Sequence, residues 1–208
     1  MEMAWSTFKD IQNHGEALLK QVLTRILEKH KGDLEIIGRD WKKLVPAVEK
    51  PFVRMTYTQA LTVLKEKFKM DIEWGKDLRT IEEEKLTTLY DVPVICTNYP
   101  KKVKAFYMKE DPQDPRTVQG CDFLAPEGYG EIIGGSQREE DLEEIKKRLV
   151  EQGEDPSQYE FYLDTRRYGS VPHGGFGMGV ERIVRWICGF ESIKDAIPFP
   201  RNPERYKP

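Results

Sequence analysis

Residues 172–182 read Pro-His-Gly-Gly-Phe-Gly-Met-Gly-Val-Glu-Arg and carry more information about this chain than any other stretch. Glycines without a Cβ atom let a backbone lie close to a ligand. A helical pattern follows, and the start of a helix offers unpaired N–H groups and a positive dipole end that suit phosphate. Arg182 adds a planar cation that can pair with phosphate oxygens or stack on a base. The stretch therefore predicts nucleotide binding, with a simple strand-to-helix turn as the alternative.

Two common nucleotide-binding motifs are excluded by spacing. Gly175, Gly177 and Gly179 form G-x-G-x-G, but Val180 stands where the dinucleotide fingerprint needs its third glycine, and no G-K-[ST] follows. In the helix after Gly179, apolar residues recur at helical spacing, which predicts a core-facing stripe of Val180, Ile183, Val184 and Ile187. Arg182 lies about 200° around the helix from Val180, so it is free to face a ligand or solvent.

Bulk composition narrows the class of protein further. The chain has 208 residues, enough for one domain, and its net charge of −3 gives no overall basic signature for nucleic acid. Three widely spaced cysteines and three histidines make a zinc site or a disulfide framework unexpected. No apolar run approaches the ~18 residues of a membrane span, and the N-terminus lacks a signal-peptide pattern. We expect a cytoplasmic protein with no membrane partner.

Periodicity predicts an α+β fold with an antiparallel sheet flanked by helices, because strands come mostly in succession. A long amphipathic helix is expected over 6–31, ended by Gly32, followed by an irregular stretch over 33–51. Capping boxes at Thr56/Gln59 and Thr80/Glu83 predict helices to about Phe68 and Tyr90. Another helix is expected over 139–150, and strands over 52–55, 93–97, 103–108, 121–124 and 130–134.

A hairpin is predicted to bring two carboxylates together. Ala125-Pro-Glu-Gly128 suits a type I turn, and that turn places Asp122 opposite Glu131 on one face of the sheet. Two facing carboxylates repel unless a cation lies between them, and oxygen ligands of this kind suit Mg²⁺ that bridges to nucleotide phosphates. The alternative is that one carboxylate pairs with a nearby arginine and no metal is involved.

Basic residues near this hairpin have competing interpretations. Arg138 follows the strand of Glu131, so its guanidinium could reach the same cleft and recognise a carboxylate, or it could pair with Glu139 or Glu140 at the surface. Three lysines, at 101, 102 and 104, alternate with small apolar residues and are expected on a solvated strand face.

These segments together resemble class II aminoacyl-tRNA synthetases of the subgroup for aspartate, asparagine and lysine (subclass IIb). Residues 177–182 resemble the third signature motif of that class, and 130–139 resemble the strand and loop that hold metal and amino acid. Residues 99–108, 167–175 and 197–201 are similar to the asparaginyl branch, in an archaeal or bacterial style. The resemblance runs from about Met3 to the C-terminus.

The resemblance implies a six- or seven-stranded antiparallel sheet that binds bent ATP, and it implies roles for single residues. Glu131 would ligate Mg²⁺ on the ATP phosphates, with Asp122 as a second carboxylate. Arg138 would hold the side-chain end of the amino acid, near Gly134, where some aspartyl relatives have serine. ATP would contact Gly179, Val180, Glu181 and Arg182. Arg182 would stack on adenine and reach the γ-phosphate, acting with Glu131 in catalysis.

The resemblance also implies a place within a larger enzyme. Residues 1–208 are expected to be the C-terminal portion of the catalytic domain, without the anticodon-binding domain and the first two motifs, and the full-length protein is expected to be a homodimer that binds tRNA. The leading hypothesis is an asparagine–tRNA ligase. The alternatives are an aspartyl-tRNA synthetase, a tRNA-independent paralogue that makes asparagine, and an inactive fragment that binds ATP or an adenylate.

Overall fold

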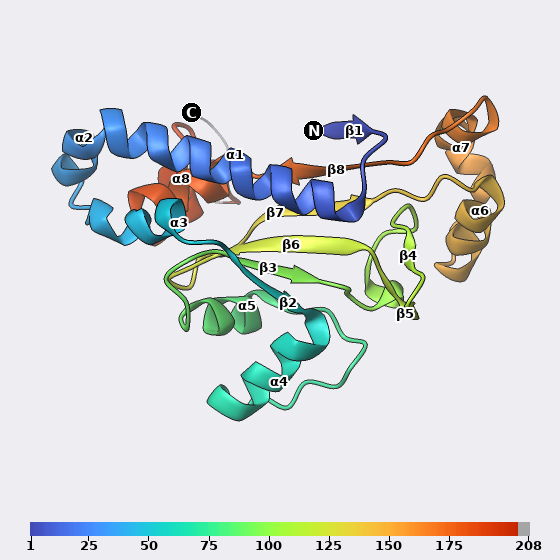
Figure 1. The fold of residues 1–208 in the computed structure, drawn as a ribbon, viewed down its shortest axis with the longest axis horizontal. Helices are drawn as coiled ribbons and strands as arrows, with labels where there is room; N and C mark the ends of the chain where they lie inside the picture. The colour runs from blue at the N-terminus through green and yellow to red at the C-terminus, as the bar shows by residue number, and fades with distance from the viewer. Residues whose placement is uncertain (204–208) are drawn as a thin grey trace.

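A mostly antiparallel six-stranded sheet forms the centre of the computed structural model, which describes residues 1–203 (Figure 1). The strand order is β1-β8-β7-β6-β3-β2, and only the β2–β3 pair is parallel. The strands are β1 (Glu2–Ala4), β2 (Val53–Thr56), β3 (Val94–Thr97), β6 (Gly120–Ala125), β7 (Gly130–Gln137) and β8 (His173–Met178). A separate hairpin consists of β4 (Glu110–Asp111) and β5 (Asp114–Val118). The expected α+β class is confirmed.

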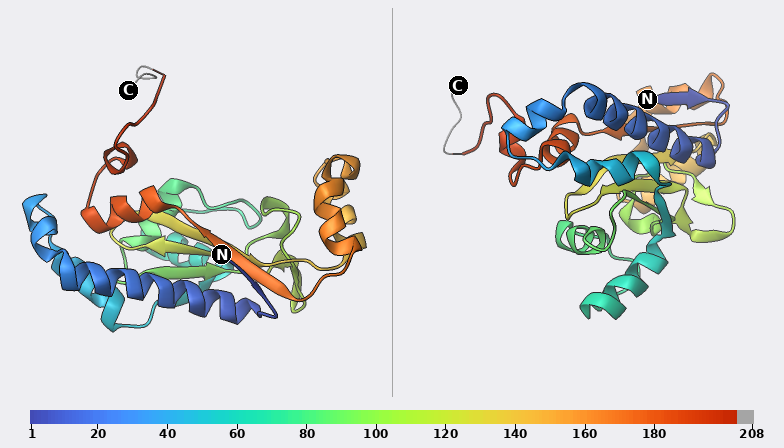
Figure 2. Two further views of the ribbon diagram at one scale, coloured as in Figure 1. Left: turned by 90° about the horizontal axis from the view of Figure 1, so that it is seen from above. Right: turned by 60° about the vertical axis from the view of Figure 1, so that its left-hand side comes forward.

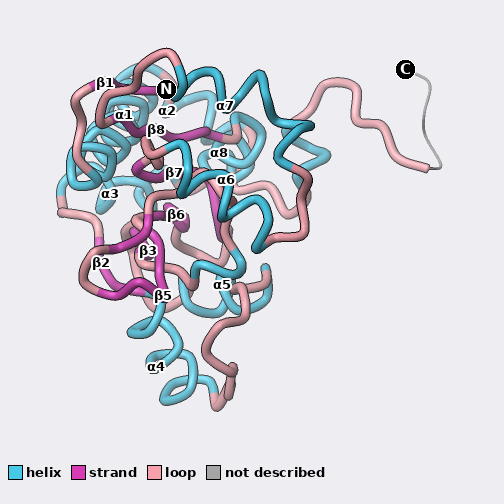
Figure 3. Tube along the Cα trace, turned by 90° about the vertical axis from the view of Figure 1, so that its right-hand side faces the viewer, coloured by secondary structure: helices cyan, strands magenta, loops and turns pink. Residues whose placement is uncertain are grey.

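Helices cover the sheet on both faces and at one end (Figures 1 and 2). The helix α1 (Phe8–Lys29) lies along one face with α3 (Val45–Glu49), while α4 (Tyr57–Phe68) and α5 (Thr80–Thr87) lie on the other. The pair α6 (Leu142–Glu151) and α7 (Glu160–Arg167) stands at one end, as the tube view also shows (Figure 3). The remaining helices are α2 (Lys31–Ile36) and α8 (Val180–Cys188). Short 3₁₀ helices occupy Trp41–Leu44, Lys101–Val103, Pro156–Tyr159 and Ile193–Ala196.

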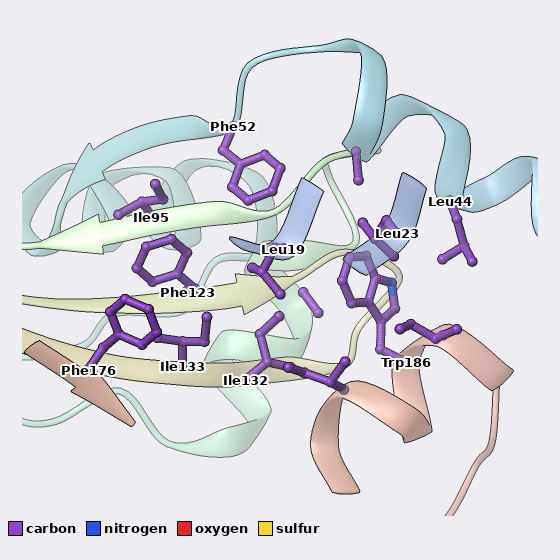
Figure 4. Close-up of a cluster of buried hydrophobic side chains, with 14 of the residues drawn as sticks. Leu19, Leu23, Leu44, Phe52, Ile95, Phe123, Ile132, Ile133, Phe176 and Trp186 are labelled. Carbon is purple, nitrogen blue, oxygen red and sulfur yellow. The ribbon is translucent and has the colours of Figure 1, made fainter. Parts of the chain in front are cut away.

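The main core lies between α1 and the sheet (Figure 4). Leu19 and Leu23 of α1 are fully buried, as expected from their four-residue spacing. Phe123 of β6 packs so close to α1 that a Cβ at Gly15 would lie 2.5 Å from its ring. Trp186 of α8 closes this core at the end near Leu44 and Ile132. A second core, which includes Leu64, Leu86, Val94 and Leu124, lies on the opposite face under α4 and α5.

Most predicted elements are present, but their ends differ. The Thr56/Gln59 capping box before α4 is confirmed. Gly32 does not end a helix, because α1 stops at Lys29 and Gly32 lies inside α2. The stretch over 33–51 is largely helical rather than irregular.

A predicted strand and a predicted cap are wrong. Residues 103–108 form no strand: Val103 ends a 3₁₀ helix, and the following loop makes only an isolated bridge from Met108 to Arg138. The buried Arg148 holds this shape by donating hydrogen bonds to the carbonyl oxygens of Lys101 (3.2 Å) and Met108 (3.4 Å). The box at the start of α5 uses Arg79 and Glu82, whose carboxylate accepts from the Arg79 N–H at 2.7 Å. Glu83 is therefore not a capping residue.

The predicted core stripe of α8 is also partly wrong. Ile183, Trp186 and Ile187 are buried, whereas Val180 is 62% exposed. The helical period places Val180 on the same side as Ile183. Val180 is, however, the first residue of the helix, and Val184 is only half-buried.

Two glycines of β8 make a matched test of this packing. A Cβ at Gly174 would lie 2.2 Å from Cδ1 of Ile11 and 2.8 Å from the carbonyl oxygen of Ser136, whereas a Cβ at Gly177 meets nothing within 4 Å. We expect Gly174→Ala to lower the free energy of unfolding by about 1–3 kcal/mol through overpacking. Gly177→Ala should leave it nearly unchanged. Urea denaturation of both variants checks this, and equal losses would contradict it.

Candidate nucleotide-binding site

The sheet face opposite α1 carries two paired glycines, Gly134 and Gly177, beside two carboxylates. We call this pair the glycine floor. A Cβ at Gly134 would lie 3.0 Å from Oε1 of Glu131 and 3.6 Å from Oδ1 of Asp122, so both carboxylates flank this glycine. Gly177 on the neighbouring strand pairs with Gly134 and has open space above it. A flat ligand can therefore approach the backbone of β7 and β8 closely here.

The hairpin that supplies the carboxylates has a different register from the predicted one. Asp122 pairs with Gly134 and Ala125 with Gly130, so Asp122 does not lie opposite Glu131. The turn covers 126–129, and Glu127 (φ 62°) and Gly128 (φ 84°) both adopt left-handed backbone conformations. These positive values exclude the predicted type I turn.

A β-bulge explains why Glu131 still shares a face with Asp122. Phe123 pairs with Ile133 and Leu124 with Glu131, which leaves Ile132 as an extra residue on β7. Strict alternation from Gly134 would put Glu131 on the α1 side. The bulge instead buries both Ile132 and Ile133 in the α1 core and turns Glu131 to the other face.

The start of α8 joins this site through Arg182. The N–H of Gly179, which caps the helix, donates to the carbonyl oxygen of Ile132 at 3.0 Å. Nη1 of Arg182 donates to the carbonyl oxygen of Glu131 at 2.8 Å and to its Oε2 at 3.0 Å. Val180 and Glu181 are exposed at the helix start. A cavity of about 380 Å³ is lined by both Glu131 and Arg182.

Asp122 has a cationic partner that the sequence did not suggest. Nζ of Lys104 lies 2.7 Å from Oδ2 of the buried Asp122 and 4.0 Å from the centroid of the Tyr99 ring. Burial raises the pKa of Asp122, and the Lys104 charge opposes that change. Lys104 was expected on a solvated strand face; that expectation is wrong because the segment is a loop whose lysine turns inward.

Glu83 of α5 is a third carboxylate in this region, and sequence reasoning assigned it only to a helix cap. Burial raises the pKa of Glu83 to about 7, with a further contribution from the negative charges of Glu131 and Asp122. Its position on α5, one residue after the true capping glutamate, directs it toward β7, where its Oε2 accepts from the N–H of Glu131 at 3.2 Å.

The raised pKa of Glu83 predicts a pH dependence of stability. The folded protein prefers the protonated form, so this contribution is fully present below the ordinary pKa of 4.5 and is lost as the pH rises through about 7. Glu83→Gln removes the titration and should raise the melting temperature relative to wild type at pH 8, but not at pH 4. Glu84→Gln on the same helix is the control. A variant that gains equally at both pH values would refute this explanation.

Arg138 lies near the other end of the same strand. Its Nε donates to Oε1 of Glu2 at 3.0 Å, its Nη1 donates to Oγ of Ser136 at 2.6 Å, and its guanidinium lies 5.1 Å from the Tyr107 ring centroid. The alternative pairing with Glu139 or Glu140 does not occur. Arg138 follows Glu131 by seven residues, one of which is the bulge residue Ile132, so the two lie about 20 Å apart along the strand at ~3.3 Å per residue. The two side chains therefore suit opposite ends of an extended ligand.

The donor set around Glu131 fits Mg²⁺ that is shared with phosphate. Among residues 1–203, no group of three or more His, Cys, Asp or Glu side chains is placed to hold a metal ion. Mg²⁺ in phosphate-transfer sites is commonly held by one or two carboxylates together with substrate phosphates. Glu131 and Asp122 are two such carboxylates, and in this structure they pair with Arg182 and Lys104. In the same part of the chain, no helix has the length and apolar character that crossing a bilayer requires.

Comparison with known proteins identifies the family. The model for tRNA synthetases class II (D, K and N) matches residues 1–203. The chain belongs to this family. Membership in this family agrees with the antiparallel-dominated sheet flanked by helices.

A relative from Pyrococcus horikoshii is similar to the chain over its whole length, in sequence and in structure. The asparagine–tRNA ligase of Pyrococcus horikoshii is 49% identical over 208 residues, which cover 100% of this chain and 48% of that protein. A crystal structure of the P. horikoshii asparaginyl-tRNA synthetase complexed with asparaginyl-adenylate matches with a TM-score of 0.95 and 49% identity, over 100% of this chain and 47% of that one.

A synthetase for another amino acid is less similar. The aspartyl-tRNA synthetase of Entamoeba histolytica matches with a TM-score of 0.85 and 29% identity, over 100% of this chain and 43% of that one. The chain thus spans about half the length of the relatives it matches.

Proposed function

We propose that this chain is part of an asparagine–tRNA ligase and that its sheet binds ATP and asparagine for adenylate formation. The observation that carries the proposal is the contact of Arg182 with Glu131 beside the glycine floor of β7 and β8. Support for asparagine comes from the 49% identity to an asparagine–tRNA ligase and from the similarity to a structure that holds asparaginyl-adenylate.

In this proposal the phosphate end of ATP lies at Glu131 and Arg182. Glu131, with Asp122 as the second carboxylate, would hold Mg²⁺, which when bound neutralises phosphate charge. Arg182 stacks on adenine and reaches the γ-phosphate, and Gly179, Val180 and Glu181 supply the neighbouring helix start. The present ion pair of Arg182 with Glu131 keeps the guanidinium in place until phosphate oxygens compete for it.

The amino acid end lies toward Arg138. Its guanidinium holds the side-chain end of asparagine, while Gly134 leaves room where a longer side chain would intrude. The carboxylate of asparagine then attacks the α-phosphorus, the bond to the bridging oxygen breaks, and pyrophosphate leaves. Catalysis in this scheme is positioning and charge neutralisation rather than proton transfer.

The remaining assignments concern the whole protein. Transfer of the asparaginyl group to tRNA, a homodimeric assembly, a cytoplasmic location and the placement of residues 1–208 in the C-terminal part of a catalytic domain stay predictions from the sequence.

ATP–pyrophosphate exchange with asparagine and with aspartate tests the proposal. We expect exchange that depends on asparagine. Exchange that depends on aspartate, together with ammonia-driven asparagine formation, would favour the tRNA-independent paralogue. ATP binding without exchange would favour a binding fragment that needs further residues for turnover.

A further inference from the structure

Glu83 contacts the backbone of the segment that carries Glu131. Oε2 of Glu83 accepts a hydrogen bond from the N–H of Glu131 at 3.2 Å. The same oxygen would lie 3.2 Å from a Cβ placed on Gly130, whose φ is +70°. The carboxylate therefore packs directly against residues 130 and 131, at the first residues of β7.

This segment is where the sheet departs from regular pairing. The extra residue Ile132 turns Glu131 toward the ligand face, and a bulge needs contacts that hold it. On one side, Gly179 and Arg182 of the α8 start bind the carbonyl oxygens of Ile132 and Glu131. On the other side, Glu83 of α5 binds the Glu131 N–H. The bulge is thus clamped between two helices.

We propose that Glu83 is a positioning residue for Glu131: its carboxylate holds the Glu131 amide and so fixes the direction in which the Glu131 side chain leaves the bulge. Glu131 and Asp122 both lie beside Gly134, so a change in the direction of the Glu131 side chain would alter the pair of carboxylates offered to a cation. The inference rests on the proposed role of Glu131 with Mg²⁺ and ATP.

Four variants separate the position of the acceptor from its charge. Glu83→Ala removes the acceptor, Glu83→Asp keeps the charge but withdraws it by one methylene, and Glu83→Gln keeps an acceptor oxygen in place without the charge. Glu84→Ala removes a neighbouring carboxylate of α5 that makes no hydrogen bond or ion pair through its side chain within residues 1–203. Titration calorimetry of the 208-residue chain with ATP, with and without Mg²⁺, measures how much Mg²⁺ tightens ATP binding.

We expect Glu83→Ala and Glu83→Asp to lose about tenfold of the Mg²⁺-dependent gain, the size typical for partners that orient a metal ligand. Glu83→Gln should keep most of the Mg²⁺-dependent gain in ATP binding, and Glu84→Ala should show the same gain as wild type. The amide proton resonance of Glu131 should shift upfield in Glu83→Ala and Glu83→Asp only. If Glu83→Ala fails to fold, the contrast of Glu83→Asp with Glu83→Gln decides alone.

Two other results would contradict either the positioning role of Glu83 or the proposed function itself. If Glu83→Gln is as weak as Glu83→Asp, or if ATP binding falls equally with and without Mg²⁺, Glu83 does not act by positioning Glu131. If wild type shows no Mg²⁺-dependent gain at all, the proposed function of this site fails first, and the inference fails with it.

Discussion

Trp186→Ala should lower the free energy of unfolding by about 3–5 kcal/mol, the range for removing a large aromatic side chain from a core. Trp186 is fully buried and packs with Leu23, Leu44 and Ile132, residues from three different elements. A cavity there would remove packing contacts between α8 and the rest of the core. A domain stability of about 5–15 kcal/mol leaves little reserve for such a loss.

Urea denaturation measures this effect, and two further variants calibrate it. Val180→Ala changes the same helix at a position that is 62% exposed, so a change within about 0.5 kcal/mol is expected. Trp186→Phe should cost less than Trp186→Ala, because the buried Nε1 has no hydrogen-bond partner among the described residues and its loss leaves no acceptor unpaired. A Trp186→Ala variant as stable as Val180→Ala would show that α8 does not depend on this contact.

Glu131→Gln should reduce asparagine-dependent pyrophosphate exchange by about 10²–10³-fold, the usual cost of losing one preorganised charge-stabilising group. The amide cannot supply the negative charge that holds Mg²⁺ against phosphate, and it weakens the anchor of Arg182 at the same time. The fold should tolerate the change, since the Glu131 side chain is 35% exposed and its removal relieves repulsion with Glu83 and Asp122.

In Glu131→Gln we therefore expect the exchange rate to fall while the melting temperature stays close to that of wild type. Glu84→Gln, which removes a carboxylate of α5 outside the cavity, is the matched control and should keep the wild-type rate. A Glu131→Gln variant with an exchange rate within about threefold of wild type would remove Glu131 from the proposed site, because a single catalytic hydrogen bond or charge costs far more.

Much of the architecture follows from local sequence signals. The apolar spacing of α1, the Thr56/Gln59 capping box and the buried strands β3 and β6 were all predictable because each depends on residues within a few positions of one another. The glycine-rich stretch before α8 belongs to the same group. Its glycines were predicted to lead into a helix that carries Arg182, and β8 followed by α8 confirms that order, while the nucleotide site itself stays a prediction.

The precise arrangement of the site was decided by contacts between distant segments. Local rules predicted a type I turn and an Asp122–Glu131 pair, whereas the ladder accommodates an extra residue at Ile132 because both it and Ile133 gain burial under α1. No pattern within the hairpin reveals that gain. Lys104 likewise reaches Asp122 from the segment 101–108, whose carbonyl oxygens accept hydrogen bonds from Arg148, more than forty residues later.

The α+β class, the long helices α1, α4 and α6 and most strands could be predicted from the sequence alone, since these depend on periodicity and capping, whereas the short helices within 33–51 could not. Which carboxylates meet, and which contacts hold them, follows from tertiary packing instead. Side-chain direction on a bulged strand depends on the packing of both faces, and the partners of Glu131 come from α5 and α8, about fifty residues away on either side.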